Sequence, residues 1–314
     1  MIKNAFVFPG QGSQSVGMMT NWRDYQPVVI DVYAQASEAL GYDLWQVVSE
    51  GPAERLNATE ITQPAMLCAG IACWQIMQQN DAMPGVELMA GHSLGEYTAL
   101  VCAQSLDITS AVKLVAKRGS LMQSAVAVGE GAMAAIIGLS DEAVLAACSS
   151  VESGIVEAVN FNAPGQVVIA GQKLAVEAAM EQAKASGAKR ALPLPVSVPS
   201  HCTLMTEAAN ELFEVLEATH FSMPVIPVIH NQNAGIANSE DEIRLLLKKQ
   251  LYQPVKWVDS VRYMHAEGIG RLIECGPGKV LSGLARRIDK SLLSAAVFDF
   301  ESFEQTIKNV SEEN

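Results

Sequence analysis

The chain has 314 residues, of which 49% are hydrophobic and 18% are charged, so it can bury a large core and lacks the composition of a disordered protein. A single core rarely exceeds ~250–300 residues, which favours one domain with an insertion. The formal net charge of −13 disfavours nucleic-acid binding, because a strongly acidic surface repels phosphate backbones.

The cysteines and the N-terminus indicate a compartment. The six cysteines include no CxxC pair, which predicts reduced thiols and neither a disulfide framework nor a structural zinc site. No signal-peptide pattern is present, and no stretch approaches the ~20 apolar residues of a membrane span. We therefore expect a cytoplasmic protein that binds no membrane.

Strand-like apolar runs alternate with helical periods, a pattern typical of an α/β protein with a largely parallel sheet. Up to residue 127 the sequence predicts strands at 5–8 and 86–90 and helices at 27–40, 64–78, 96–104 and 108–125. The helix at 64–78 is apolar nearly all round, so we expect it to be buried.

The order of predicted strands and helices changes at about residue 128. The following segments predict a strand at 132–139, a helix at 140–150, strands at 155–160 and 167–171, a helix at 173–186 and a strand at 189–196. This β-α-β-β-α-β order is that of a ferredoxin-like unit, and prolines in the last strand favour an edge position. We expect residues 128–197 to form a ferredoxin-like subdomain inserted into a larger core made of 1–127 and 198–314, which the motifs below make the catalytic part.

After the insertion the α/β alternation resumes. The sequence predicts helices at 203–216, 240–251, 258–267 and 280–287 and strands at 225–230, 272–275 and 295–298. The acidic end, residues 311–314, is typical of a frayed tail.

The clearest chemical signal is the segment Gly91-His92-Ser93-Leu94-Gly95, which lies between a predicted buried strand and a predicted helix. This context is that of a nucleophile elbow, the strained turn that exposes a serine hydroxyl in α/β-hydrolase-like folds. The helix N-terminus offers free N–H groups to a developing oxyanion. We therefore expect an α/β-hydrolase-like core with Ser93 as nucleophile and the Leu94 N–H as oxyanion donor; a glycine-flanked turn with an incidental serine is the alternative.

A serine nucleophile needs a base, and the chain has five histidines: His92, His201, His220, His230 and His265. His92 adjoins the serine on a sharp turn, where neighbouring side chains point apart, so a supporting hydrogen bond suits it better. His220 and His265 are typical of loop and surface positions. His201 lies where the inserted subdomain rejoins the core, and a cleft there would place it opposite the serine. His230, at the end of a strand, is the alternative.

Arg118 falls inside the apolar stripe of the helix at 108–125. An arginine that points inward needs a partner, because an unpaired buried charge is costly. Its planar fork suits a carboxylate, which it can bind with two hydrogen bonds. A substrate carboxylate, an internal ion pair and a side chain that reaches the surface all remain open from these residues alone.

Several segments together resemble malonyl-CoA:acyl carrier protein transacylases, most closely the free-standing bacterial enzymes of type II fatty acid synthesis. They are FPGQGSQ at 8–14, GHSLGE at 91–96, NFNAPGQ at 160–166, PSH at 199–201, QLYQPV at 250–255 and ECGPGKVL at 274–281. They span nearly the whole chain in the family's order, so the combination is far more specific than any one segment.

The resemblance implies roles for individual residues. Ser93 would be the nucleophile and His201 the general base, then the general acid. Gln250 would orient the histidine through its backbone carbonyl, in place of the usual carboxylate. The backbone N–H groups of Gln11 and Leu94 would form the oxyanion hole.

The resemblance also decides among the open readings of Arg118, since its position matches the arginine that holds the free carboxylate of malonate. Further candidates for contacts with the substrate are His92, Gln63, Asn160, Asn162 and Ser200. Gln63 is expected near the mouth of the site. For the two asparagines, bracing of their loop is favoured over contact with the ligand.

The partners implied are malonyl-CoA and acyl carrier protein, in a ping-pong cycle by a monomer with no metal and no other cofactor. Carrier proteins are acidic, so docking needs a local basic face. The candidates for docking the carrier and coenzyme A are Lys189 with Arg190 and Arg286 with Arg287. Alternatives are a serine thioesterase or other hydrolase, a non-catalytic carrier-binding scaffold, and a malonyl-loading transferase of polyketide or decarboxylase assembly.

Overall fold

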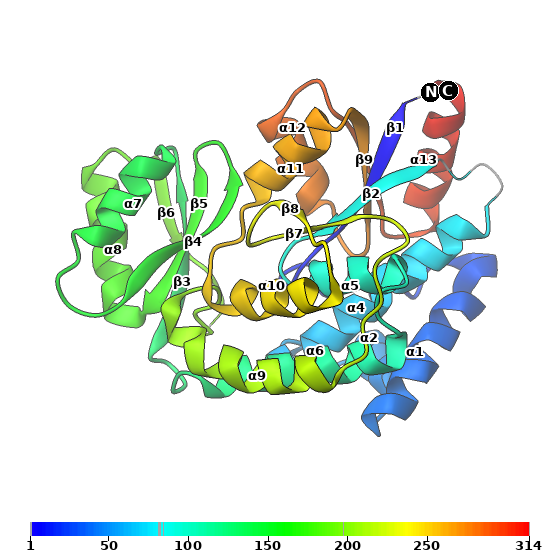
Figure 1. Cartoon of the computed structure of the whole chain (residues 1–314), viewed down its shortest axis with the longest axis horizontal. Coiled ribbons are helices and arrows are strands. Elements are labelled where there is room, and N and C mark those ends of the chain that lie inside the picture. The colour runs from blue at the N-terminus through cyan, green and yellow to red at the C-terminus, as the bar shows by residue number, and fades with distance from the viewer. Residues whose placement is uncertain (1, 81–82, 84, 197, 314) are drawn as a thin grey trace.

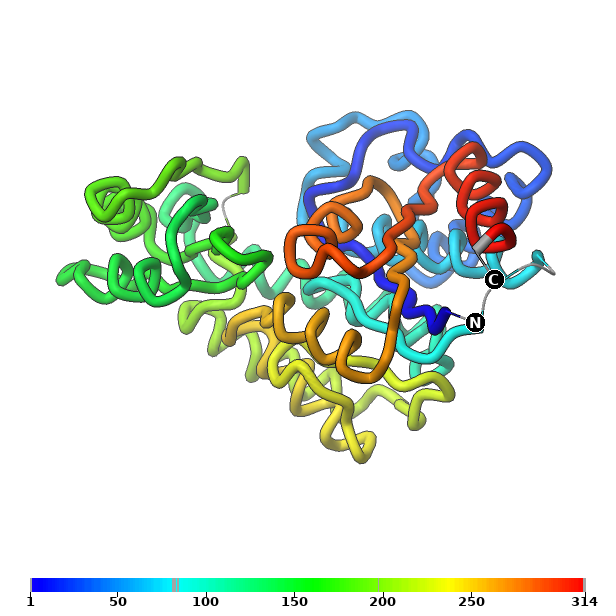
Figure 2. Tube along the Cα trace, turned by 90° about the horizontal axis from the view of Figure 1, so that it is seen from above, coloured from blue at the N-terminus to red at the C-terminus, as the bar shows by residue number. Residues whose placement is uncertain are grey.

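The computed structural model describes residues 2–80, 83, 85–196 and 198–313. Figure 1 shows a larger unit with a central sheet between helices and a smaller sheet-and-helix unit beside it. Figure 2, seen from above, shows the same small unit, formed by the middle of the chain, projecting to one side. The predicted α/β class with an inserted second unit is confirmed.

The larger unit contains a six-stranded sheet in the order β10-β9-β1-β2-β7-β8. All of its neighbours pair in parallel except β7 and β8. Its strands are β1 (Lys3–Phe8), β2 (Val86–Gly91), β7 (Val228–His230), β8 (Gly235–Ile236), β9 (Ile269–Cys275) and β10 (Leu293–Val297). The continuous apolar run at the end of β1 is fully buried, as expected for a central parallel strand covered on both faces.

Helices cover both faces of this sheet (Figure 1). On the N-terminal side of the insertion they are α1 (Gln26–Leu40), α2 (Leu44–Glu50), α3 (Ala53–Leu56), α4 (Thr59–Gln78), α5 (Gly95–Cys102) and α6 (Ile108–Ser124), preceded by the 3₁₀ turn η1 (Arg23–Tyr25). After it come η2 (Thr203–Met205), α9 (Thr206–Ala218), α10 (Glu240–Tyr252), α11 (Trp257–Ala266), α12 (Val280–Ile288) and α13 (Phe300–Glu313). As predicted from its composition, α4 is buried along most of its length.

The smaller unit is a four-stranded antiparallel sheet in the order β4-β5-β3-β6, with α7 and α8 packed together on its core. Its elements are β3 (Gly131–Ile137), α7 (Asp141–Ser149), β4 (Val156–Ala163), β5 (Gln166–Gln172), α8 (Lys173–Ala185) and β6 (Arg190–Pro193). The β-α-β-β-α-β order and the edge position of β6 agree with the sequence. All these elements lie within 128–197, whose bounds as a domain stay a prediction.

Three local expectations need correction. The helix expected to begin at Pro64 begins at Thr59, because the proline sits inside α4. The short helices α2 and α3 were not predicted. The expected frayed tail is helical as far as Glu313, because Phe303 and Val310 of α13 bury their side chains in the core; Asn314 lies outside the described residues.

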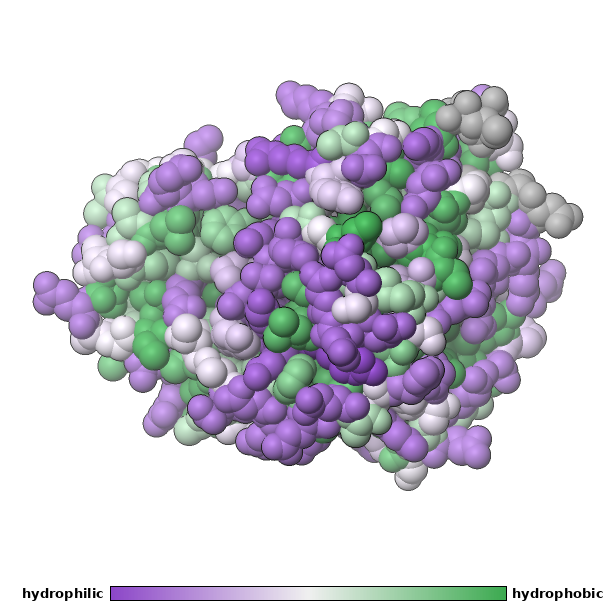
Figure 3. All heavy atoms as spheres, in the orientation of Figure 1, coloured by the Kyte–Doolittle hydropathy of each residue, from purple (hydrophilic) through white to green (hydrophobic). Residues whose placement is uncertain are grey.

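The polarity of the surface and the state of the cysteines agree with what the composition predicts. On the face shown in Figure 3, hydrophilic residues predominate, with smaller apolar areas between them. All six cysteines are buried and unpaired, as the absence of CxxC pairs predicts. Across the described ranges, no helix combines the length and the apolar character needed to cross a membrane.

Candidate active site

Ser93 lies at the sharp turn between β2 and α5, with a left-handed φ of 52°. Left-handed backbone is costly for a residue with a Cβ, so the surrounding structure must hold this turn in place. The flanking glycines allow the close approach, because a Cβ on Gly91 would overlap the Gly95 backbone and one on Gly95 would overlap Phe8. The turn therefore has the geometry of a nucleophile elbow.

His201 contacts the serine. Its Nε2 lies 2.8 Å from the Ser93 Oγ, and its Nδ1 lies 2.6 Å from the backbone carbonyl oxygen of Gln250. The carbonyl can only accept, so Nδ1 carries the proton and the Nε2 lone pair faces the serine hydroxyl. The arrangement can take a proton from Ser93, and no carboxylate of the residues that the structure describes contacts the imidazole directly.

The electrostatic surroundings keep His201 neutral. Burial, then the charge of Arg118, lowers the pKa of His201 to about 3, although the bond to the Gln250 carbonyl acts in the opposite direction. A neutral imidazole is the form that accepts a proton, so His201 is in its proton-accepting form at neutral pH.

Arg118 of α6 points inward and only 1% of it is exposed. Its Nη1 donates to the Oε1 of Gln63 at 2.7 Å, and its Nη2 donates to the Oε1 of Gln250 at 2.9 Å and to the Ser93 Oγ at 3.1 Å. No carboxylate of the described residues lies within ion-pairing distance of it. Among the described residues an internal ion pair and a surface position are therefore excluded, and the buried guanidinium faces the Ser93 hydroxyl.

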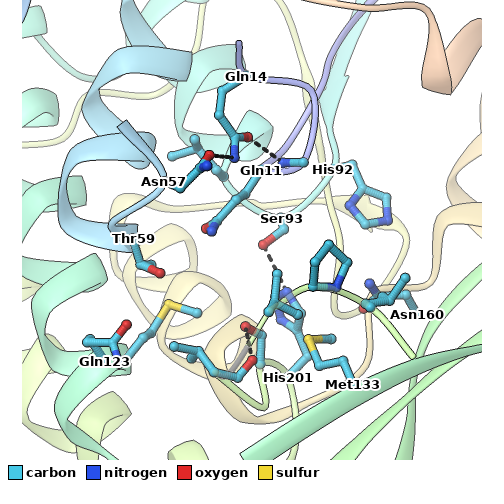
Figure 4. Close-up of a pocket in the computed structure, with 18 of the residues that line it drawn as sticks. Gln11, Gln14, Asn57, Thr59, His92, Ser93, Gln123, Met133, Asn160 and His201 are labelled. Carbon is cyan, nitrogen blue, oxygen red and sulfur yellow. Dashed lines mark hydrogen bonds between the residues drawn. The ribbon is translucent and has the colours of Figure 1, made fainter. Parts of the chain in front are cut away.

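These side chains share one cavity of about 390 Å³ between the two units. Figure 4 shows Ser93 and His201 joined across it, with Gln11 on the opposite side of the serine. Of the residues predicted for the site, the cavity is lined by Gln11, His92, Ser93, Leu94, Arg118, Asn160, Ser200 and His201. The cavity is thus lined by a serine hydroxyl, a neutral imidazole and a buried guanidinium.

Two backbone N–H groups complete the arrangement. Leu94 is the N-cap of α5, and Gln11 follows the end of β1. Within the described part of the chain, neither N–H donates to a protein acceptor. Both residues line the cavity, so both N–H groups are available to an oxyanion formed at Ser93.

Comparison of the chain with known proteins shows the family to which it belongs. The model of the acyl transferase domain matches residues 5–287. The malonyl CoA-acyl carrier protein transacylase of Haemophilus influenzae is 53% identical over 304 residues, covering 96% of this chain and 97% of that protein. That of Escherichia coli strain K12 is 53% identical over 298 residues, covering 95% and 96%. The chain belongs to the malonyl-CoA–acyl carrier protein transacylase family.

Solved structures of the family have the same fold. An acyl carrier protein S-malonyltransferase from Vibrio cholerae superposes with a TM-score of 0.93 at 53% identity, covering 96% of this chain and 99% of that one. A malonyl-transacylase solved in complex with a type II polyketide acyl carrier protein superposes with a TM-score of 0.96 at 51% identity, covering 98% and 99%.

The other predicted ligand contacts of this transacylase-family chain divide into two groups. Asn160 and Ser200 line the cavity, and the buried Oδ1 of Asn160 has no hydrogen-bond partner in the described residues. Asn162 and Gln63 do not line it. Asn162 braces His92, whose Nε2 lies 2.8 Å from its Oδ1.

The expectation that Gln63 lies near the mouth is therefore corrected. Gln63 belongs to α4 and is fully buried, because that helix passes behind Arg118. Its side chain accepts from the guanidinium instead of facing the cavity. Its place is that of a support for Arg118.

The candidate docking residues lie away from the cavity. Arg286 donates to Ser294 on β10, and Arg287 donates to the Oε1 of Gln166 on β5. In the small sheet, Ile137 pairs with both Gln166 and Arg190, so Arg190 and Arg287 lie at one end of that sheet. Met133, which lines the cavity, lies four residues earlier on β3, about 13 Å along the strand.

The remaining histidines are accounted for. His230 is buried 2.7 Å from Glu96, so it is no substitute base for Ser93. His265 and His220 lie at the surface, as expected.

Other lining residues were not predicted: Gly12, Gln14, Asn57, Thr59, Met122, Gln123, Met133, Leu194, Pro195, Val196 and Val198. Gln14 lies inside the FPGQGSQ segment that carried the family resemblance. It accepts from the Gly12 N–H at 2.7 Å and donates to Asn57 at 2.9 Å, which shapes the loop that bears Gln11. That motif was the available signal for it.

Proposed function

We propose that this chain transfers the malonyl group of malonyl-CoA to the phosphopantetheine thiol of acyl carrier protein through an ester on Ser93, supplying malonyl carrier for fatty acid synthesis. The observation that carries the proposal is the buried guanidinium of Arg118, 3.1 Å from the Ser93 Oγ. A substrate with a carboxylate one methylene from its thioester places both groups where this pair needs them.

In the first half-reaction, His201 Nε2 takes the proton of the Ser93 hydroxyl while Oγ bonds to the thioester carbonyl carbon. The negative charge on the carbonyl oxygen is held by the N–H groups of Gln11 and Leu94. When the intermediate collapses, the carbon–sulfur bond breaks and His201 returns the proton to the coenzyme A sulfur. The products are the Ser93 ester and the free thiol.

The second half-reaction runs the same steps in reverse on another thiol. The carrier's phosphopantetheine thiol gives its proton to His201 and its sulfur bonds to the ester carbonyl carbon. The Ser93 oxygen leaves and takes back the proton. Because both thioesters use one site in turn, the kinetics are ping-pong.

Arg118 supplies the selectivity. The malonate carboxylate accepts hydrogen bonds from the guanidinium, whereas an acetyl group leaves this buried cation facing an uncharged methyl. Leaving a buried donor unpaired costs free energy, so the site should reject substrates that lack the carboxylate.

The carrier itself has a second candidate. Type II fatty acid synthesis is the first proposal because the resemblance is to free-standing enzymes of that system. A family member at 51% identity is described as the malonyl-transacylase of a type II polyketide carrier with which it was solved. Loading of a polyketide carrier is therefore the alternative for this chain.

Product analysis tests the proposal. Purified protein, malonyl-CoA and a phosphopantetheinylated carrier protein should yield malonyl-carrier and free coenzyme A in equal amounts, with malonate only as a trace. Release of free malonate as the main product would identify a hydrolase. Absence of either product, with the carrier bound, would identify a scaffold. Matched assays with fatty acid and polyketide carriers separate the two candidate pathways.

A further inference from the structure

Glu96 is a fully buried carboxylate in the first turn of α5, three residues after Ser93. It does not line the cavity, and the chemistry described above gives it no part. A buried charge is costly unless its surroundings satisfy it, so its contacts are informative.

Both oxygens of Glu96 are engaged. Oε2 accepts from the Nε2 of Gln250 and from the backbone N–H of Asn231, each at 2.9 Å. Oε1 lies 2.7 Å from the Nδ1 of the buried His230. One carboxylate thus joins α5, α10 and the end of β7.

The contact with Gln250 connects Glu96 to Arg118. The Gln250 side-chain amide lies between two buried charges: its Nε2 donates to Glu96, and its Oε1 accepts from Arg118 at 2.9 Å. The reversed amide would place N–H against the guanidinium and C=O against the carboxylate, so only one orientation is favourable. Glu96 therefore fixes which end of Gln250 faces Arg118, while the Gln250 backbone carbonyl separately holds His201.

The contact with Asn231 connects Glu96 to Ser93. The Oδ1 of Asn231 accepts from the Ser93 N–H at 2.6 Å, and its Nδ2 donates to the Gly91 carbonyl at 2.6 Å. These two bonds span the strained elbow. Gln250 adds a third contact there, since its Nε2 also donates to the Ser93 carbonyl at 2.9 Å.

We propose that Glu96 is a positioning residue that aims Arg118 at the substrate carboxylate through the amide of Gln250 and holds the Ser93 elbow through Asn231. The inference rests on the function proposed above and extends it to a residue outside the cavity. When a residue orients a reacting group through hydrogen bonds without touching the substrate, removal of those hydrogen bonds typically lowers activity 10- to 100-fold.

Two substitutions at Glu96 separate hydrogen bonding from packing. Glu96→Met keeps a similar volume and removes both acceptor oxygens, whereas Glu96→Gln keeps an acceptor oxygen toward Gln250 and Asn231. Rates of Ser93 ester formation are measured by intact mass with malonyl-CoA and with acetyl-CoA. For Glu96→Met we expect the malonyl-to-acetyl ratio of kcat/KM to fall about tenfold. Glu96→Gln should stay within about threefold of the unmodified protein.

The ratio is a readout that a purely structural role would not move, because loss of folded protein lowers both rates equally. Glu274→Met is the matched control. It removes another fully buried carboxylate, one that caps α12 at the Leu281 and Ser282 N–H groups away from the cavity, and should leave the ratio unchanged.

An unchanged ratio in Glu96→Met, or an equal fall in Glu96→Gln, would overturn the proposal. If Glu96→Met does not fold, Gln250→Met decides, since it breaks the same link and keeps the backbone carbonyl that His201 needs; there too the ratio should fall about tenfold. Failure of the unmodified protein to form the malonyl ester would instead refute the proposed function.

Discussion

Nη2 of Arg118 lies 3.1 Å from the Oγ of Ser93, so one hydrogen bond joins a buried cation to the proposed nucleophile. Arg118 belongs to α6, and Ser93 lies in the turn between β2 and α5. The two helices are neighbours in the core because α4 packs against both of them. Malonyl-CoA carries its carboxylate one methylene from the reacting carbonyl. In the proposed function, Arg118 binds that carboxylate while Ser93 attacks the neighbouring carbonyl carbon.

Replacement of Arg118 by alanine should convert selectivity. We expect kcat/KM for malonyl transfer to fall about 100-fold, which corresponds to loss of a charge-assisted contact of about 3 kcal/mol, while acetyl transfer stays equal or rises. Parallel assays with the two thioesters measure it. Lys117→Ala, the exposed neighbour on α6, is the control. Equal losses for both acyl groups would contradict the assigned role.

Protonation of His201 should couple stability to pH. Its pKa is about 3 in the folded protein, against ~6.5 for a free imidazole. Between these values the unfolded chain binds a proton that the folded chain excludes, so the contribution is complete above about pH 6.5 and is lost as pH falls toward 3. When the pH falls from 7 to 5, the free energy of unfolding of His201→Gln should therefore fall by about 2 kcal/mol less than that of the unmodified protein.

Urea titrations at the two pH values measure this difference. His265→Gln, at the surface, serves as control and should follow the unmodified protein. If His201→Gln loses as much stability as the unmodified chain between pH 7 and 5, the imidazole is not held neutral by burial.

Gly95 should tolerate no side chain. A Cβ there would overlap the backbone of Phe8, so Gly95→Ala must displace either β1 or the elbow, at a cost of about 3 kcal/mol or more in unfolding free energy. Gly283→Ala, in α12, meets no atom within 4 Å and should be neutral or stabilising by up to ~1 kcal/mol. Thermal unfolding compares the two, and equal stabilities would contradict the elbow packing.

Charge reversal at Arg190 tests the docking surface. Arg190 and Arg287 both border the end of the small sheet at Ile137, so they offer one local basic area on an acidic protein. We expect Arg190→Glu to raise KM for both the carrier and malonyl-CoA several-fold with little change in kcat, and the effect should shrink at high salt. Lys308→Glu, on α13, is the control. Unchanged KM values would remove this area from the docking surface.

Most of the helices and strands, and the turn that bears Ser93, could be predicted from the sequence for a physical reason. Hydrophobic periods and glycine-bounded turns are local, so the elbow at Ser93 and the ferredoxin-like unit were visible in short windows. The inward position of Arg118 followed from its place in an apolar helical stripe. The choice of His201 over His230, by contrast, needed the family resemblance, because both histidines end or follow segments near the core.

Other features had no local signal. The bonds from Gln250 to Glu96 and Arg118 join residues 154 and 132 positions apart, so no spacing in the chain indicates them. A search for an acid behind His201 would find a backbone carbonyl in its place. Residues 311–313 are helical although their acidic composition predicts a frayed tail, because Phe303 and Val310, earlier in α13, are buried in the core.

The most direct test of the central claim is the intact mass of the protein after mixing with malonyl-CoA, followed by peptide mapping. The account predicts one malonyl group per chain, located on the peptide that contains Ser93, absent in Ser93→Ala and removed by a carrier protein bearing a free phosphopantetheine thiol. A malonyl group on any other residue, or its persistence in Ser93→Ala, would contradict it.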